Sequence, residues 1–170
     1  MAANLREIHD AFELLFRALV NKSFTKSKEA ESWGEQELLF SVRTFLLGYF
    51  KEESVFPEAK AILPGKLSGR LDFIIDGVAV EFAVRRPNKQ KRCLKNVENE
   101  SEVKKLLKFN GKSILVLFDF SSDPLTDTDL DEYRNHPSLG KGNHGKSPYQ
   151  ISYFYKKIGK ADSIRKQIRL

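Results

Sequence analysis

The sequence predicts a single α/β domain with a mixed central sheet, and three observations support this. Apolar residues recur at helical spacing in two N-terminal segments, residues 4–21 and 27–50. Three strand-like segments follow in direct succession, at residues 54–63, 69–75 and 78–85. A helix at 99–110 then leads into an apolar strand at 114–118, and such a crossover makes this strand parallel to the one before the helix.

Length and composition fit one globular domain. With 170 residues, of which 41% are hydrophobic, the chain is long enough to build a sizeable core, and we expect one domain over residues 1–170 with its core at about 31–156. No apolar run approaches the ~20 residues of a membrane span, and the first residues lack the shape of a signal peptide. A single cysteine, Cys93, indicates a reducing compartment, so we predict a cytoplasmic protein and leave a nuclear location open.

The two N-terminal helices differ in how much of their surface is apolar. The first carries a narrow stripe, made of Leu5, Ile8, Phe12, Leu15, Phe16 and Val20. The second has a wider stripe and should be largely buried. His9 lies beside the first stripe, and we interpret it as a satisfied or surface histidine. In the first strand, Pro57 cannot donate a ladder hydrogen bond, which predicts an edge or a bulge.

The central feature is a hairpin around Asp76-Gly77, the dipeptide that most strongly favours a two-residue hairpin turn. Such a turn pairs Ile75 with Val78 and, further along the strands, Asp72 with Glu81. Because side chains alternate between faces, one face is entirely apolar and should be a core wall: Leu71, Phe73, Ile75, Val78, Val80, Phe82 and Val84. The other face carries Arg70, Asp72, Ile74, Ala79, Glu81, Ala83 and Arg85.

Asp72 and Glu81 should therefore face each other, with Cβ atoms about 4.5–5.5 Å apart. Like charges placed in this way are destabilising unless a cation lies between them. Mg²⁺ or Mn²⁺ fits, because these ions bind one or two carboxylates and fill their remaining positions with water and phosphate oxygens. The alternative is a pair of solvated carboxylates, although Ile74 and Ala79 indicate that this face is partly covered.

The hairpin resembles the core of the PD-(D/E)XK, or restriction-endonuclease-like, nucleases. The resemblance covers residues 31–120 and rests on Gly69-Arg70-Leu71-Asp72-Phe73-Ile74-Ile75-Asp76-Gly77 followed by Glu81. It implies a three-layer α/β/α sandwich with a mixed central sheet, in which Asp72 and Glu81 bind Mg²⁺ or Mn²⁺. It also implies two further ligands, the backbone carbonyl of Phe82 and the carboxylate of Glu35 on the preceding helix. A solvated helix face remains the alternative for Glu35.

The chain departs from this family at one position. The family places a Lys two residues after the Glu, where it assists the attacking water, and this chain has Ala83 there. The hairpin register places Arg70 opposite Ala83, with Arg85 two residues further along, so Arg70 and then Arg85 are candidates for the missing cation. Arg stays protonated and can stabilise charge without acting as a base. The alternative is that Arg70 only pairs with Asp72 or Glu81 in a metal-free protein.

A basic segment follows the strand that carries Glu81. We predict that Arg86, Lys89, Lys91 and Arg92 contact the phosphates of a nucleic acid, although a solvated loop is the default for any charged run. The formal net charge of +6 fits a polyanionic partner.

The elements after the basic segment complete the predicted fold. Asn99 with Glu102 resembles a capping box at the start of the crossover helix. The apolar run at 114–118 is typical of a strand buried on both faces. Alternation at 149–156 predicts a last strand, and the basic tail from residue 158 is expected to be helical or frayed.

Three functions follow from this sequence. The first is a metal-dependent nuclease, an endonuclease that hydrolyses phosphodiester bonds of DNA or RNA. The second is a catalytically impaired nuclease-fold protein that binds nucleic acid or a protein partner, which Ala83 favours. The third is a structural module whose charge serves only solubility. The choice between DNA and RNA stays open, as does the formation of a homodimer.

Overall fold

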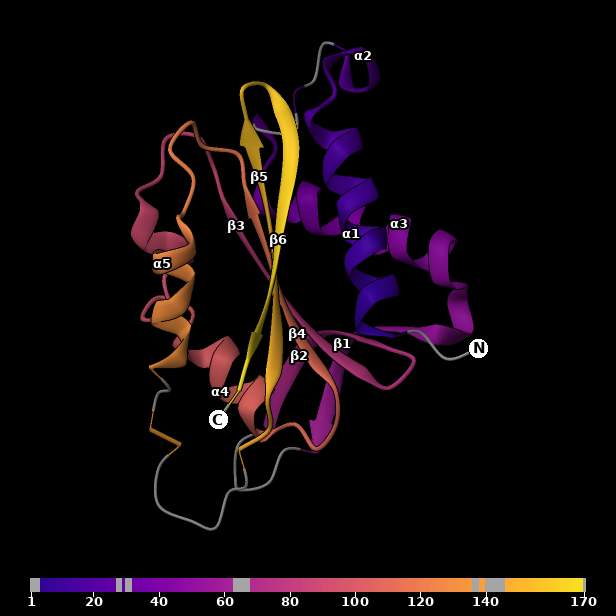
Figure 1. The fold of residues 1–170 in the computed structure, drawn as a ribbon. Helices are drawn as coiled ribbons and strands as arrows, with labels where there is room; N and C mark the ends of the chain where they lie inside the picture. The colour runs from indigo at the N-terminus through magenta and orange to yellow at the C-terminus, as the bar shows by residue number, and fades with distance from the viewer. Residues whose placement is uncertain are drawn as a thin grey trace.

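The structure is a computed structural model that describes residues 4–26, 29, 32–62, 68–135, 138–139 and 146–169. One six-stranded sheet, with its strands in chain order, runs through the molecule (Figure 1). The strands are β1 (Val55–Ile62), β2 (Ser68–Ile75), β3 (Val78–Arg85), β4 (Ser113–Asp119), β5 (Tyr149–Lys157) and β6 (Lys160–Ile168). The central strands β3, β4 and β5 are parallel and the remaining pairs are antiparallel, so the sheet is mixed, as predicted.

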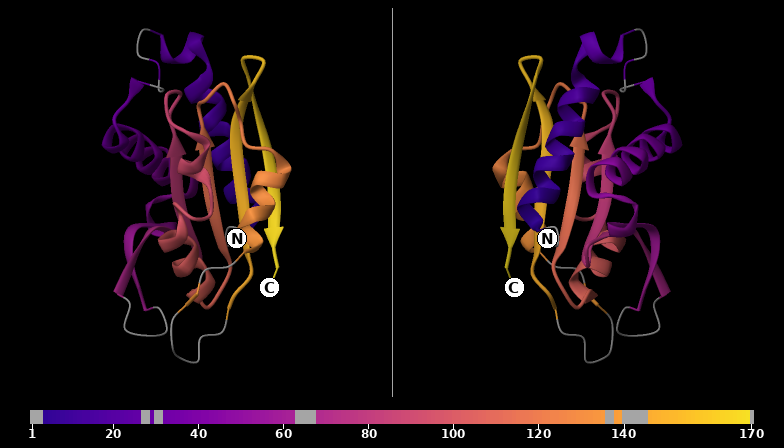
Figure 2. Two further views of the ribbon diagram at one scale, coloured as in Figure 1. Left: turned by 90° about the vertical axis from the view of Figure 1, so that its left-hand side faces the viewer. Right: turned by 90° about the vertical axis from the view of Figure 1, so that its right-hand side faces the viewer.

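Helices lie against both faces of this sheet (Figure 2). They are α1 (Leu5–Val20), α2 (Lys22–Thr25), α3 (Glu35–Phe50), α4 (Glu100–Lys108) and α5 (Asp127–Asp131), with short 3₁₀ turns η2 (Glu52–Ser54), η3 (Lys91–Leu94) and η4 (Glu132–Arg134). Helices α1 and α3 contribute to one apolar cluster with the sheet, and α4 and α5 to another. All seven residues of β4 are buried because it lies at the centre of the sheet, which confirms the prediction for this strand.

The central hairpin has the predicted turn, and its predicted register holds for the first three pairs but not for Asp72–Glu81, which is not a pair of the ladder. Asp76 and Gly77 both have positive φ, 46° and 80°, as a type I′ turn requires. Ile75 pairs with Val78, and two further pairs extend the ladder to Phe73–Val80. The apolar face forms as expected except at Leu71, which lies in the other cluster, with α4. Leu71 lies beyond the end of the β2–β3 ladder, where β2 pairs with β1 alone.

Several local predictions were wrong. The second helix begins at Glu35, after Gly34, and not near residue 27. It is also not largely buried, because Phe40 is 68% and Tyr49 43% exposed, while its buried side chains form a single stripe of Leu38, Val42, Leu46 and Phe50. Asn99 does not cap α4 through its side chain; its amide donates hydrogen bonds to the carbonyls of Cys93 and Lys95 and to the Tyr133 hydroxyl. The tail is strand β6, because pairing along the whole of β5 satisfies backbone groups that a frayed tail would leave exposed. Among the described residues, no helix is both long enough and apolar enough to cross a bilayer.

Candidate functional site: a cleft between two diverging strands

The candidate site lies where β3 separates from β2. Beyond the Phe73–Val80 pair, β3 continues in register with β4 as far as Arg85, while β2 continues in register with β1. Asp72 lies at the start of the gap between them. Its Oδ2 atom accepts a hydrogen bond of 2.8 Å from the backbone N–H of Phe82, so a side chain replaces the missing ladder partner.

Glu81 occupies the floor of this gap. Its side chain is only 1% exposed, and the Nζ atom of Lys105 on α4 lies 3.0 Å from both of its carboxylate oxygens. Lys105 therefore turns toward the sheet, although a lysine on a short helix of this kind would be expected to face solvent. A usable signal was present, because Glu81 stands between Ala79 and Ala83 on one face of β3, and such small side chains let the covering helix come close.

The electrostatics of Glu81 are unfavourable for a carboxylate. Burial raises the pKa of Glu81 to about 8, and the nearby Asp72 carboxylate adds to this rise. The Lys105 ammonium opposes the rise in pKa without cancelling it. A buried acid beside a second acid ionises readily only when more positive charge is supplied, and a divalent cation supplies it.

A cleft of about 280 Å³ opens beside these groups. Its walls come from α3, β2, β3, the segment before α4 and the first turn of α4, and are made of Leu39, Asp72, Phe82, Ala83, Val84, Cys93, Glu98, Asn99 and Glu102. Asp72 thus reaches the cleft, while Glu81 lies behind it and contacts Lys105. Glu98 and Glu102 add acidic charge to the rim, which favours cations near the opening.

The donor set fits a hard divalent metal ion. In an extended strand, the N–H and C=O groups of one residue point to the same side. The N–H of Phe82 faces Asp72, so its carbonyl also faces the gap. Two carboxylates and one carbonyl are oxygen donors of the kind that Mg²⁺ and Mn²⁺ prefer, with water completing the shell. Glu35 is the first residue of α3, and its side chain lies outside the described part of the structure.

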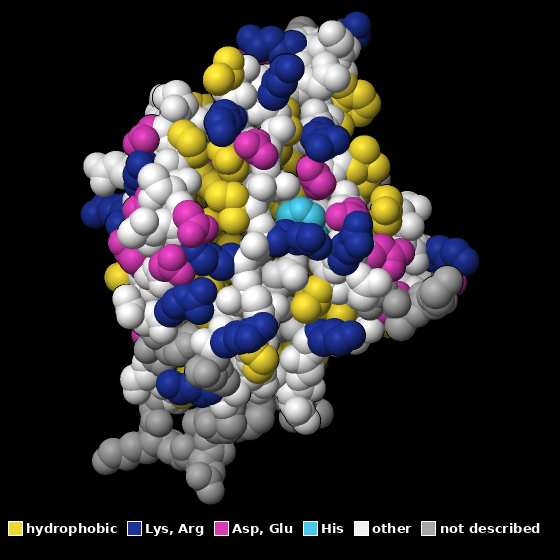
Figure 3. Space-filling model, viewed as in Figure 1, with side chains coloured by type: hydrophobic (Ala, Val, Ile, Leu, Met, Phe, Trp, Pro, Cys, Tyr) yellow, Lys and Arg dark blue, Asp and Glu magenta, His cyan; other side chains and the backbone are white. Residues whose placement is uncertain are grey.

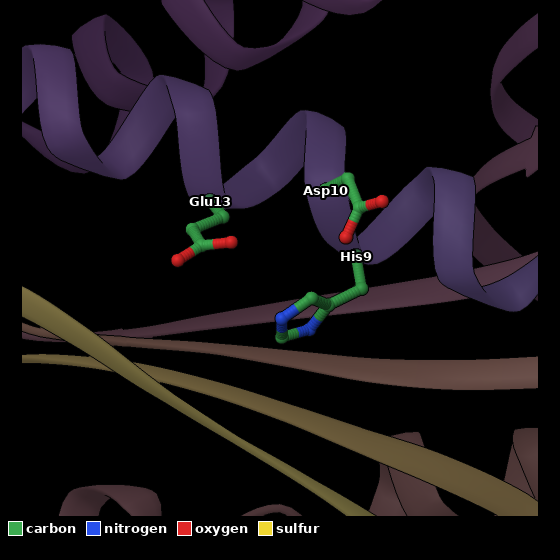
Figure 4. Close-up of side chains that lie close together, drawn as sticks. All are labelled: His9, Asp10 and Glu13. Carbon is green, nitrogen blue, oxygen red and sulfur yellow. The ribbon is translucent and has the colours of Figure 1, made fainter.

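A second group of possible ligands lies on α1. It consists of His9, Asp10 and Glu13, whose possible ligand atoms all lie within 4.8 Å of one another (Figure 4). Among the described residues, no other cluster of at least three His, Cys, Asp or Glu side chains is this compact. Each acid already has a cation, since Asp10 lies 3.9 Å from Arg6 and Glu13 lies 2.8 Å from Arg17. These arginines compete with a metal ion for both carboxylates.

The surroundings of His9 account for its burial without a metal. Figure 4 shows its ring reaching from α1 toward the strands, where Nδ1 lies 2.9 Å from the Ser152 hydroxyl. The ring also stacks on Phe154 at a centroid distance of 4.8 Å. Burial lowers the pKa of His9, and the Arg165 charge lowers it further. We therefore assign His9 a packing role, in line with its interpretation as a satisfied histidine.

Arg70 does not lie opposite Ala83. It pairs with Lys60 of β1 in the sheet, and its guanidinium lies 3.4 Å from the Glu58 carboxylate. The side chain is 65% exposed. The prediction failed because it extended the hairpin register beyond the Phe73–Val80 pair, where the β2–β3 ladder has already ended.

Arg85 is buried and held by several acceptors, contrary to its predicted place beside the cleft. Its guanidinium lies 3.1 Å from the Asp119 carboxylate and donates to the carbonyls of Asp123 at 2.8 Å and Lys89 at 2.9 Å. Tyr153 donates to the same Asp119 carboxylate at 2.7 Å. Arg85 therefore anchors the basic segment to the loop after β4, and this is a structural role.

The basic segment runs from the end of β3 into η3. Lys91 forms an ion pair of 3.0 Å with Asp123, and Arg92 lies 3.8 Å from Glu98 on the cleft rim. The side chains of Arg86 and Lys89 have no ion pair among the described residues. The segment thus passes beside the cleft with two of its charges compensated, and its contact with nucleic acid stays a prediction.

Comparison with protein-family models, with curated proteins and with solved structures gives no match. What the chain does is therefore inferred from its own residues. The structure brings together Asp72, Glu81 and the backbone of Phe82. It adds Lys105, which was not predicted, and it removes Arg70 and Arg85 from the immediate surroundings of Glu81.

Proposed function

We propose that this chain is a metal-dependent nuclease that hydrolyses phosphodiester bonds of DNA or RNA, built as a restriction-endonuclease-like three-layer α/β/α sandwich. Several features support this architecture. Helices cover both faces of the mixed sheet, and the β1–β2–β3 meander is followed by the crossover helix α4 and the parallel strand β4. The two acids lie on adjacent strands where these strands separate.

The observation that carries the proposal is the state of Glu81. A carboxyl group that is 1% exposed, lies next to Asp72 and contacts Lys105 is costly to bury, and its pKa is raised to about 8. Strained electrostatics of this kind are concentrated at functional sites. A position selected only for stability would be served better by an apolar residue, given that Ala79 and Ala83 flank it on the same face.

Each group at the site would have its own role in hydrolysis. Asp72, Glu81 and the Phe82 carbonyl would hold Mg²⁺ or Mn²⁺. Such an ion would supply Lewis-acid chemistry, which activates water and polarises a phosphate. Lys105 supplies the cation that Ala83 lacks, reaching the site from α4 instead of from β3. Its ammonium holds Glu81 in place and can stabilise negative charge on the phosphoryl oxygens.

The basic segment would hold the substrate. Arg86 and Lys89 lie at the carboxyl end of β3, and a net charge of +6 favours association with a polyanion. The Arg85 network fixes the Lys89 carbonyl, so this segment starts from a rigid base.

A second function, binding of nucleic acid without cleavage, is favoured by one observation. Lys105 contacts both oxygens of Glu81 and already provides a partner for this acid in a metal-free protein. If that pair excludes the metal, the cleft remains a binding surface.

A cleavage assay with a metal-binding measurement decides between these functions. We expect wild type to cleave some member of a panel of linear and circular DNA and structured RNA with Mn²⁺ or Mg²⁺, and calorimetry to show binding at millimolar metal. The Asp72→Asn, Glu81→Gln double variant should lose both. Asp76→Asn is the matched control, because it removes an acid from the same hairpin while Asn-Gly suits the same turn. Metal binding without cleavage would favour the second function, and no metal binding by wild type would contradict the proposed site.

A further inference from the structure

The tip of the β5–β6 hairpin combines three unfavourable features. Ile158 is 96% exposed and has a φ of 50°, followed by Gly159 at 73°. Positive φ is strained for a β-branched residue, and the type I′ turn favours Asn or Asp at this position. In addition, Lys157 faces Lys160 directly across the ladder, and like charges so placed are destabilising.

A basic cavity lies beside this tip. Its volume is about 510 Å³, and it separates the tip from the end of α1 and from α2. Every charged residue in its lining is basic, as the full set shows: Arg17, Val20, Asn21, Lys22, Ser23, Lys156, Gly159, Lys160 and Ala161. Figure 3 shows Lys and Arg side chains gathered at this end of the molecule, with hydrophobic side chains between them. Arg17 and Lys22 are compensated by Glu13 and Glu29, whereas Lys157 and Lys160 have no ion pair among the described residues. The uncompensated charge therefore lies at the tip, next to the exposed Ile158, and suits a ligand that is anionic and has an apolar part.

The sheet topology places this tip near the basic segment that follows β3. Strands β3, β4 and β5 are parallel, so their carboxyl ends meet at one edge of the sheet. Arg85 of β3 pairs with Asp119 of β4, and Asp119 pairs with Tyr155 of β5. Arg85 and Tyr155 are therefore two strand spacings apart, which is about 10 Å. Beyond this level β5 continues to Lys157, so the tip projects past the edge that carries residues 86–92.

We infer that the tip of the β5–β6 hairpin binds duplex DNA, with Lys157 and Lys160 on the phosphates and Ile158 inserted as a wedge between base steps. The choice of nucleic acid as the ligand rests on the proposed nuclease function. Apolar wedges such as Ile unstack and kink duplexes, whereas single strands are held by aromatic stacking, which this tip cannot supply. A bilayer is a weaker fit, because one Ile side chain buries little apolar area in a membrane.

The decisive variant is Ile158→Asn, measured in EDTA so that no substrate is cut. Asn suits the turn, so the melting temperature should rise, while the affinity for a short fluorescein-labelled DNA duplex should fall about tenfold as the wedge is lost. A 2-aminopurine in the duplex should brighten on binding wild type and stay quenched with the variant. Misfolding cannot explain weaker binding by a more stable protein.

The charge component has its own pair of variants. Lys157→Gln with Lys160→Gln removes the repulsion at the tip, and the slope of log affinity against log salt should flatten by about 0.9 for each lost contact. Lys112→Gln is the matched control, since Lys112 is exposed at the amino end of β4, at the opposite edge of the sheet. It should leave the slope unchanged.

The outcomes separate this inference from the nuclease proposal. Wild type in EDTA should bind the duplex through the tip, whether or not it cleaves any substrate with Mn²⁺ or Mg²⁺. Duplex binding that is unchanged in Ile158→Asn would overturn the inference, as would failure of wild type to bind the duplex. Binding to phosphatidylserine vesicles without binding to DNA would overturn it in favour of a membrane.

Discussion

The two hairpins of the sheet share a turn type but differ in which part is irregular, the ladder in one and the turn residues in the other. The β2–β3 turn has Asp76-Gly77, the residues that a type I′ turn favours, yet its ladder ends after three pairs. The β5–β6 ladder runs over nine pairs, from Tyr149–Ile168 to Lys157–Lys160, yet its turn contains Ile158 at a φ of 50°.

Each departure coincides with one of the two proposed sites. In β2–β3 the favourable turn holds the strands together at one end, so that they can separate and admit Asp72 at the other. In β5–β6 the complete ladder tolerates an unfavourable turn that exposes Ile158. Residues that lower the stability of an element, with no evident gain elsewhere, are expected at functional positions. One hairpin therefore concentrates its cost in the buried Glu81 beside Asp72, and the other in an exposed tip.

The largest effect that would sharpen this comparison is expected from Lys105→Ala. If Lys105 replaces the cation missing at Ala83, its loss should lower the cleavage rate by on the order of 10²–10³-fold, with metal binding retained. Ala83→Lys in the same background should restore part of the rate. Lys104→Ala is the matched control, since Lys104 is on the same helix and forms its ion pair with Glu100 instead. Equal losses in both single variants would contradict the assignment.

A smaller effect concerns stability and pH in EDTA. The pKa of Glu81 is raised to about 8 in the folded protein because of burial and then Asp72, so the folded state binds a proton that the unfolded state releases. The free energy of unfolding should therefore fall as pH rises from the normal pKa of a glutamate to about 8, by on the order of a few kcal/mol.

Urea unfolding of wild type and Glu81→Gln across this range measures the effect. Groups other than Glu81 contribute equally to both proteins, so the difference between the two curves isolates this carboxyl group. We expect the variant to gain on wild type as pH rises, and Mg²⁺ to stabilise only wild type at high pH. Parallel curves would show that Glu81 titrates normally.

The smallest effect tests the turns themselves. Asp76→Ile places in the first hairpin the residue that the second one has, and it should destabilise the protein by about 1–2 kcal/mol, through strain at positive φ. Ile158→Asn makes the reverse change and should stabilise by a similar amount. Thermal unfolding of both variants and of wild type measures the pair. If Asp76→Ile leaves the melting temperature unchanged, an isoleucine at this turn position causes little strain. The conformation of Ile158 would then be no evidence of function.

Much of the fold could be predicted because it depends on local patterns. The helical stripe before residue 21, the Asp76-Gly77 turn and the apolar run of β4 each specify an element through the period of their side chains. The tail was harder, since its charged residues show neither period clearly, and it becomes strand β6 only because β5 offers an edge to pair with. The start of the second helix was also placed too early.

The candidate site divides in the same way. From its pattern alone, the chain determined that Asp72 and Glu81 lie on adjacent strands of one hairpin, because a two-residue turn sets the register. Only the tertiary structure decided that this ladder ends at Phe73–Val80, that Lys105 turns inward to Glu81 and that Arg85 is buried against Asp119. Local sequence sets the period and register of an element, whereas strand separation and helix-to-sheet contacts depend on packing between segments far apart in the chain.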